Sequence, residues 1–296
     1  MLASFLTTLF FSLSVIFAAR TARMLGGPLA NLGRIAVATC LLAVWAHGFG
    51  AGVRGPALPW FFLSGVIGFG LGDMALFAAL PRIGPRLAIL LTQCLAAPVA
   101  ALVEWRWLGT TLPPAAMGWA ALILAGVALA LAPDRGMEVS RRTFWIGVLA
   151  GGGSALGQAL GAVVSRKANL VAVAAQYPID GGSAAYQRIL GGLLMTVVAV
   201  AAMRSARVAQ PRGEWRAAGP WVLANALAGP SIGVGCYQWA LKTTPSGIVL
   251  PIVATSPLVT LVLSFFIDGQ RPTRRAVAGG IIAVLGAVLL KRAQGG

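Results

Sequence analysis

The chain consists mostly of long apolar segments that follow one another with only short connections between them. Ten of these segments each come close to the roughly 20 residues that an α-helix needs to cross the hydrocarbon core of a membrane. They cover residues 2–19, 29–49, 58–80, 85–107, 114–131, 144–165, 184–203, 220–241, 247–267 and 275–290. The longest connection, about 166–182, leaves no room for a soluble domain. This pattern predicts an all-α integral membrane protein with ten transmembrane helices.

The composition excludes the main alternatives to a helical membrane protein. Only 10% of the residues are charged, whereas soluble domains carry about 25%. A membrane β-barrel needs short segments of alternating polarity, and the runs here are continuous. We expect the first run to remain as a membrane span rather than to be cleaved as a signal peptide, because it lacks a basic start and leads through Arg20 into a second span.

The net charge of +16 does not indicate a nucleic-acid partner. The 23 Lys and Arg residues are spread between the apolar runs and form no basic arm or patch. Such a distribution is typical of residues that set membrane topology and contact anionic lipid headgroups. We therefore expect the lipid bilayer, and not nucleic acid, to be the partner of these cations.

Few residues in the chain are suited to metal or cofactor chemistry. Three cysteines lie inside apolar runs without a CxxC pair, and His47 is the only histidine. Neither a disulfide framework, a metal centre nor a catalytic triad is predicted, and no cofactor is expected. The chain also lacks a phosphate-binding loop of the GxxxxGK[ST] type, which disfavours ATP-driven pumping.

One stretch of the sequence occurs twice. Residues 79–98 read ALPRIGPRLAILLTQCLAAP, and residues 240–257 read ALKTTPSGIVLPIVATSP. Each begins with Ala-Leu at the end of an apolar run, crosses a basic turn that contains a proline, and enters another run with an internal proline. The segments that follow, LGTTLPPAAMGWAALILAGVALAL and DGQRPTRRAVAGGIIAVLGAVLL, are also similar. The repetition indicates a duplicated membrane protein, in which a substrate site usually lies between the repeats.

These repeat units resemble the drug/metabolite transporter superfamily in its EamA-like ten-helix branch. The resemblance is carried by the two proline-bearing spans, the LG- or DG-type turns after them and the final spans with two spaced glycines. Arg34 and Arg188 match the arginine often found near the second span of each repeat. The sequence departs from the family where a glutamate often follows the proline-bearing span, since Thr110 and Gln270 stand there.

The resemblance implies two inverted five-helix repeats, residues 1–132 and 143–291, around a central cavity that opens alternately to the two sides of the membrane. It also implies a transporter rather than an enzyme, with both termini in the cytoplasm. The positive-inside rule gives the opposite orientation, because most of the Lys and Arg residues follow odd-numbered spans. The orientation therefore stays open, as does the choice between a monomer and a homodimer.

Polar residues at helical spacing mark the spans that are expected to line the cavity. Gln93, Ala97, Ala100 and Glu104 share one face of the fourth span. Glu104 lies near the end of its span, so an interfacial carboxylate is the alternative. Similar stripes include Gln158 in the sixth span, Gln238 in the eighth, and the series Ser256, Thr260 and Ser264 in the ninth. In the last series the hydroxyls could instead bond to their own helix.

Asp73 is the most costly residue to place in lipid. A charge at the bilayer centre costs about 2.5–3.5 kcal/mol on insertion scales, so such a residue usually faces a cavity or a partner. The functional interpretation is a site that carries a proton or binds a substrate amine. The structural alternative is an ion pair with Arg34 or Arg188.

Other residues carry weaker predictions. Arg34 and Arg188 could contact an anion in the cavity mouth or could anchor their helices at the interface. Pro98 and Pro257 occupy equivalent places in the repeats and are predicted hinges. Tyr237 is predicted to pack between helices or to lie in the interfacial belt, and an aromatic wall of the ligand site is the alternative. Glycines at intervals of four, in 153–161 and 68–72, predict close helix contacts.

The function predicted is a secondary active exporter of a small organic metabolite such as an amino acid, coupled to protons, in the cytoplasmic (inner) membrane. Its expected site comprises Asp73, Gln93, Gln158, Gln238 and Glu104. One alternative is a carrier of sugar phosphates or nucleotide-linked metabolites, which two cavity arginines would favour. The alternatives from other classes are an integral-membrane enzyme that modifies lipids and a structural membrane protein.

Overall fold

A computed structural model describes residues 1–132, 140–205, 214–268 and 273–295. All the regular elements in these ranges are helices. Eight helical segments within the described residues are long and apolar enough to cross a membrane. The predicted all-α class is confirmed. In lipid an α-helix satisfies its own backbone hydrogen bonds, so an apolar chain of this kind forms helices.

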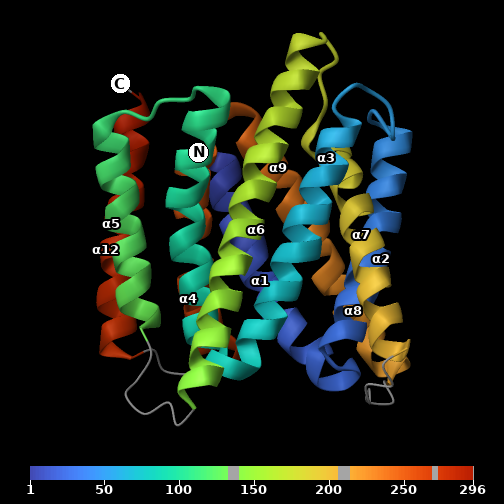
Figure 1. Ribbon diagram of the computed structural model, residues 1–296, viewed down its shortest axis with the longest axis horizontal. Coiled ribbons are helices and arrows are strands. Elements are labelled where there is room, and N and C mark those ends of the chain that lie inside the picture. Colours follow the sequence, from blue (N-terminus) through green and yellow to red (C-terminus); the bar gives the residue numbers. More distant parts are fainter. Residues whose placement is uncertain (133–139, 206–213, 269–272, 296) are drawn as a thin grey trace.

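The described residues of the first half form six helical elements. They are α1 (Leu2–Leu25), α2 (Gly27–Gly48), α3 (Leu58–Gly65), the π-helix η1 (Val66–Gly72), α4 (Asp73–Leu108) and α5 (Pro114–Leu131). The predicted span 114–131 coincides with α5. Within α4, Gly84 has non-helical angles (φ 72°, ψ 161°), and the chain reverses direction there (Figure 1). Glycine adopts this positive φ without strain, and Pro85 disfavours a helical residue before it.

The described residues of the second half form eight helical elements. They are α6 (Arg141–Ala174), α7 (Gly181–Ser205), α8 (Trp215–Ala226), the π-helix η2 (Leu227–Gly233), α9 (Val234–Thr243), α10 (Ser246–Val253), α11 (Ser256–Asp268) and α12 (Arg274–Gly295). The helix α6 runs well past residue 165, where the predicted span ends. Arg166 does not end the helix, because its side chain is held inside the protein by hydrogen bonds.

The helices stand side by side, and both termini lie at the same end of the bundle (Figure 1). One edge is formed by the pair α5 and α12, and the opposite edge contains α2, α7 and α8. The long helices α4 and α6 pack against each other between these edges. We call the end with the termini the terminal end and the other the distal end.

Each half contains one seven-residue π-helix within a span. The first, VIGFGLG, is rich in glycine, and the second, LAGPSIG, contains Pro230. Proline removes a helical hydrogen bond and pushes on the preceding turn, which favours a widened turn at this point. Such π segments are frequent at functional sites. Nothing in the sequence analysis predicted them.

Small residues allow close contacts between helices, as the glycine spacing predicted. A Cβ atom at Gly157 would lie 2.5 Å from Cα of Gly72, and one at Gly161 would lie 3.1 Å from Cα of Gly68. At Gly153 the neighbour is farther, with Cβ of Ala75 at 3.6 Å. The predicted contacts are therefore confirmed for Gly157 and Gly161. Van der Waals contact of this kind replaces the hydrophobic drive that lipid removes.

The connection between α6 and α7 is held by Asp180. Its Oδ1 accepts hydrogen bonds of 2.9 Å from the backbone N–H groups of Gly182 and Ser183 and from Nε1 of Trp45. Its Oδ2 accepts one from the hydroxyl of Ser183. Partial burial alone would raise the pKa of Asp180, but these hydrogen bonds outweigh it and lower the pKa below the ordinary 3.8.

Replacing Gly65 by Ala tests the close helix packing. A Cβ atom there would lie 1.8 Å from the backbone oxygen of Arg188, so the backbones must separate. Such overpacking costs about 1–3 kcal/mol. We expect a lower melting temperature in detergent, followed by tryptophan fluorescence. The matched control is Gly118→Ala in α5, where nothing lies within 4 Å of the new atom. Equal melting temperatures for the two variants would contradict the contact.

Replacing Asp180 by Ala tests the cap of α7. At neutral pH the loss should be about 0.5–2 kcal/mol, as for other N-terminal caps. Because the folded-state pKa is below 3.8, the contribution of Asp180 is present above that pH and is lost as the pH falls through the lowered pKa. The difference in melting temperature between the wild type and Asp180→Ala should therefore shrink under acid conditions. A difference that persisted unchanged at the lowest pH would contradict a charged cap.

Candidate functional site

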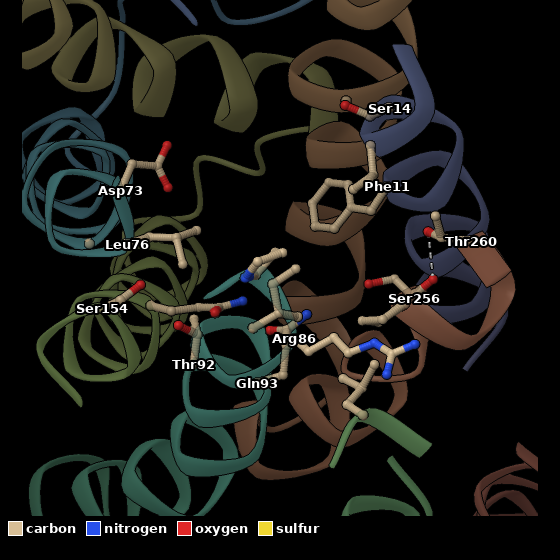
Figure 2. Close-up of a pocket in the computed structure, with 18 of the residues that line it drawn as sticks. Phe11, Ser14, Asp73, Leu76, Arg86, Thr92, Gln93, Ser154, Ser256 and Thr260 are labelled. Atoms are coloured by element: carbon tan, nitrogen blue, oxygen red, sulfur yellow. Dashed lines mark hydrogen bonds between the residues drawn. The ribbon is translucent and has the colours of Figure 1, made fainter. Parts of the chain in front are cut away.

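A cavity of about 520 Å³ lies between the helices. Figure 2 shows side chains of Phe11, Asp73, Gln93 and Ser256 around this common space. They come from α1, α4 and α11, which belong to both halves of the chain. Both π-helices also line the cavity, through Gly68, Phe69 and Gly72 of η1 and Gly229 and Pro230 of η2. The widened turns in the two spans thus lie where the backbone borders the cavity.

The cavity extends toward the distal end of the bundle. Its lining there includes Arg86, just after the reversal at Gly84, together with Leu131 at the end of α5 and Thr273 before α12. The lining does not include the residues that connect α9 and α10 near the terminal end. The cavity is therefore asymmetric with respect to the two faces of the bundle.

Asp73 lies on the cavity wall, immediately after η1. Its Oδ2 is 3.7 Å from Nη2 of Arg34, and the two side chains are 29% and 21% exposed. Nε of Arg34 also donates a hydrogen bond of 2.8 Å to Oδ1 of Asn31. Both interpretations of Asp73 therefore agree with its position, since it faces the cavity and forms an ion pair there. Partial exposure keeps this pair open to water or to a ligand.

Arg188 also lines the cavity but is only 6% exposed. Its Nη1 donates a hydrogen bond of 3.2 Å to Oγ of Ser165. The same oxygen accepts a hydrogen bond of 3.2 Å from Nε2 of Gln238 and lies 2.7 Å from Oγ of Ser64. This polar group connects α3, α6, α7 and α9 beside the cavity. It holds the guanidinium of Arg188 at one position on the wall.

The remaining predicted site residues divide into two groups. Gln93 and Gln158 line the cavity, together with the predicted polar residues Ser154, Ser256, Thr260 and Ser264. Gln238 is 1% exposed and lies behind the wall, where it contacts Ser165 rather than the cavity. Glu104 also lies outside the lining and is 1% exposed. The polar stripe of the fourth span thus contributes Gln93 to the cavity, while its last residue has another environment.

Glu104 joins three other helical elements. Its Oε1 is 3.3 Å from Nε of Arg166, and its Oε2 accepts hydrogen bonds from the hydroxyl and, at 2.7 Å, the backbone N–H of Ser246. Nη1 of Arg166 donates to the carbonyl oxygens of Leu241 and Lys242, both at 2.8 Å. We call Glu104, Arg166 and Ser246 the Glu104 cluster. It ties α4 to α6, α9 and α10, on the terminal side of the cavity.

The two predicted hinges have different surroundings. Pro257 lines the cavity and follows the two-residue interruption between α10 and α11. Pro98 is exposed on α4, whose non-helical angles occur at Gly84 instead. The hinge function itself stays a prediction. Of the two positions at which the sequence departs from the family pattern, Thr110 lies outside the cavity lining, and Gln270 lies outside the described residues.

Sequence reasoning missed several cavity residues. Phe11 and Ser14 on α1 line the cavity, as does Thr92, whose buried hydroxyl has no hydrogen-bond partner. The small polar residues of α1 were a signal that could have indicated this face. Tyr237 was predicted to pack between helices, and it is 5% exposed, but it also lines the cavity. A buried aromatic residue gives no sequence signal that separates these two environments.

Comparisons with known proteins relate the chain to one family. A sequence model described as the EamA-like transporter family matches residues 145–292. No curated protein sequence matches the chain. One crystal structure of a protein superimposes with a TM-score of 0.79 at 19% identity, over 99% of this chain and 96% of the other. At that identity the likeness shows a shared fold and nothing about function.

Replacing Glu104 by Ala tests the Glu104 cluster. The change leaves Arg166, whose side chain is only 14% exposed, without its carboxylate, and breaking a buried ion pair costs about 3–5 kcal/mol. We expect a markedly lower melting temperature in detergent and a smaller loss for Glu104→Gln, whose amide oxygen can still accept a hydrogen bond. The control is Glu214→Ala, at an exposed position whose side chain caps no helix. If the two alanine variants melted alike, the cluster would not stabilise the protein.

Proposed function

This chain belongs to the EamA-like transporter family and is a multi-pass membrane protein; from that membership we propose that it is a secondary active carrier. The proposed cargo is a small organic metabolite such as an amino acid, which the carrier exports across the cytoplasmic (inner) membrane in exchange for protons. The observation that carries the proposal is the cavity between the halves, with Asp73 and Arg34 paired on its wall. Membership of a transporter family favours this function over a lipid-modifying enzyme or a structural protein.

We propose further that the chain crosses the membrane ten times, as two inverted repeats with the boundaries 1–132 and 143–291. The reversal at Gly84 divides the 51-residue segment Leu58–Leu108 into two spans. The consecutive elements α8, η2 and α9 supply one further span between residues 215 and 243. The match of the family to 145–292 supports the second boundary.

The contacts of the two π-helices support the repeat relation. The helix η1 packs against α6 and α7, which begin the second half, and η2 packs against α1 and α2, which begin the first. The pairs α2 with α7 and α5 with α12 contact each other directly. A twofold relation between the halves requires that each π-helix contact the first two helices of the other half in this way. A cavity at such an interface is where inverted-repeat transporters bind their substrate.

Transport by such a protein requires the cavity to open to each side in turn. Here it extends to the distal end, while the Glu104 cluster holds α4 against α6, α9 and α10 on the terminal side. Opening of the terminal side would separate these helices and break the contacts of Glu104. The cluster is therefore the proposed closure of the terminal side in this conformation.

Asp73 is the proposed coupling group. Among the described residues that line the cavity, it is the one carboxylic acid. Protonation would remove its charge and release Arg34 from the pair, which changes the charge that a substrate meets. Gln93 and Gln158 line the same cavity as Asp73 and are proposed to form hydrogen bonds with the substrate.

A second candidate is a carrier of sugar phosphates or nucleotide-linked metabolites. It is favoured by the observation that Arg34 and Arg188 both line the cavity, since guanidinium groups bind phosphate with two parallel hydrogen bonds. Competition by phosphate esters, but not by zwitterionic amino acids, would support this candidate over the first.

Replacing Asp73 by Asn tests the coupling. A screen of metabolites released from cells with and without the protein first identifies a cargo, which is then followed in proteoliposomes under a pH gradient. We expect Asp73→Asn to move the cargo only down its own gradient, with no response to pH, because the amide cannot carry a proton. The control is Glu214→Gln, an exposed carboxylate away from the cavity. Unchanged pH-driven transport in Asp73→Asn would remove this residue from the mechanism.

A further inference from the structure

We propose that Arg188 is the site at which the cavity binds an anionic group of its cargo. The anionic group is a carboxylate, a sulfonate or a phosphate, and the body of the molecule is apolar. The inference deepens the proposed function, because it assumes that the cavity is the path of transport. The sequence analysis treated Arg34 and Arg188 as equal candidates for contact with an anion, and the inference assigns that contact to Arg188.

The burial of Arg188 is the first observation. Its side chain is only 6% exposed, yet no carboxylate of the described residues lies within ion-pair distance of it. An unpaired cation away from water is costly, and such charges in membrane proteins usually mark a ligand pathway. Asp73, which lines the same cavity, forms its ion pair with Arg34.

The surroundings of the guanidinium are the second observation. Its central carbon lies 5.2 Å from the ring centre of Phe69 and 5.5 Å from that of Tyr237. Both rings stabilise the cation. Nη1 donates to Ser165, whereas Nε is buried without a hydrogen-bond partner. An anion that entered the cavity could therefore accept hydrogen bonds from a group that is already oriented.

The backbone leaves room for this arrangement. A Cβ atom on Gly68 would lie 2.6 Å from Nη2 of Arg188, so a larger residue at this position of η1 would displace the tip of the side chain. Gln238 lies behind the wall and shares Ser165 with Arg188. It is a positioning residue that acts through the serine rather than a contact for the cargo.

The charges on the cavity wall favour an anionic group on the cargo. Arg34 and Asp73 form a pair of opposite charges, and Arg188 and Arg86 are further cations of the lining. A negative group beside Arg188 would neutralise that guanidinium. The neighbouring walls contain Phe11, Phe69, Leu76 and Tyr237, which suit an aromatic or aliphatic body.

Binding to the purified full-length protein in detergent tests the inference. The probes are phenylacetate and phenyl phosphate, with the neutral 2-phenylethanol and the cationic 2-phenylethylamine for comparison, measured by calorimetry and by the shift in melting temperature. We expect the wild type to bind an anion most tightly. Arg188→Gln should weaken that binding by about ten- to hundredfold, as expected for the loss of charged hydrogen bonds, and should change the binding of the neutral alcohol little.

Three further variants keep the test decisive. Arg188→Lys retains the charge without the planar fork and should bind the anion with intermediate affinity. Gly68→Ala retains Arg188 but displaces the tip of its side chain, and it should also weaken anion binding. This variant provides the test if Arg188→Gln does not fold. Arg106→Gln is the matched control, since Arg106 lies over the ring of Trp105 on the exposed surface, outside the cavity. It should bind like the wild type.

The outcomes separate this inference from the proposed function. Equal anion affinity in the wild type, Arg188→Gln and Gly68→Ala, or a wild type that binds the alcohol as tightly as the anions, would overturn the inference. Arg188-dependent binding without movement of any solute in proteoliposomes would support the anion site and overturn the carrier. Phosphate preferred over carboxylate would support the anion site and favour the second candidate cargo.

Discussion

The structure depends on the requirement that backbone N–H and C=O groups inside lipid find partners within the protein. Regular α-helix meets this requirement locally, which is why the described elements are helical. The departures from regular helix are few and are placed where the chain is enclosed by other helices. The π-helices η1 and η2 border the cavity, and the interruption between α10 and α11 directly precedes the cavity residues Ser256 and Pro257. Irregular backbone at this depth is tolerated beside a cavity because water or a ligand can reach it there.

The same constraint governs the charged side chains. Asp73 has Arg34 beside it and remains partly exposed, as a group that must exchange a proton would be. Glu104 is buried, but each carboxylate oxygen has a partner, and Arg166 satisfies two carbonyl groups as well. Arg188 is buried with aromatic rings and one serine around it. These three environments suit a coupling group, a structural closure and a ligand contact, respectively.

Much of the fold could be predicted from the sequence, because hydrophobic length and glycine spacing are local properties. The span 114–131 coincides with α5, and a close helix contact at Gly157 was anticipated from spacing alone, although its partner Gly72 was not. The end of α6 was predicted too early, because a basic residue such as Arg166 normally marks the membrane interface. Its partner Glu104 is distant in the sequence, so no local pattern could show that the arginine is buried within a continuing helix.

Part of the candidate site could likewise be predicted from the sequence, and part of it could not. The sequence by itself determined that the chain forms membrane helices, that Gln93 and Gln158 lie on polar faces of two of them, and that Asp73 requires a cavity or a partner. Periodicity and the cost of charge in lipid are sufficient for those conclusions. Only the tertiary structure decided that these faces meet in one cavity, that Gln238 lies behind its wall, and that Glu104 joins α4 to α6 and α10 outside the lining. The physical reason is that helix periodicity orients a side chain about its own axis, whereas the packing of distant helices decides what that side chain meets.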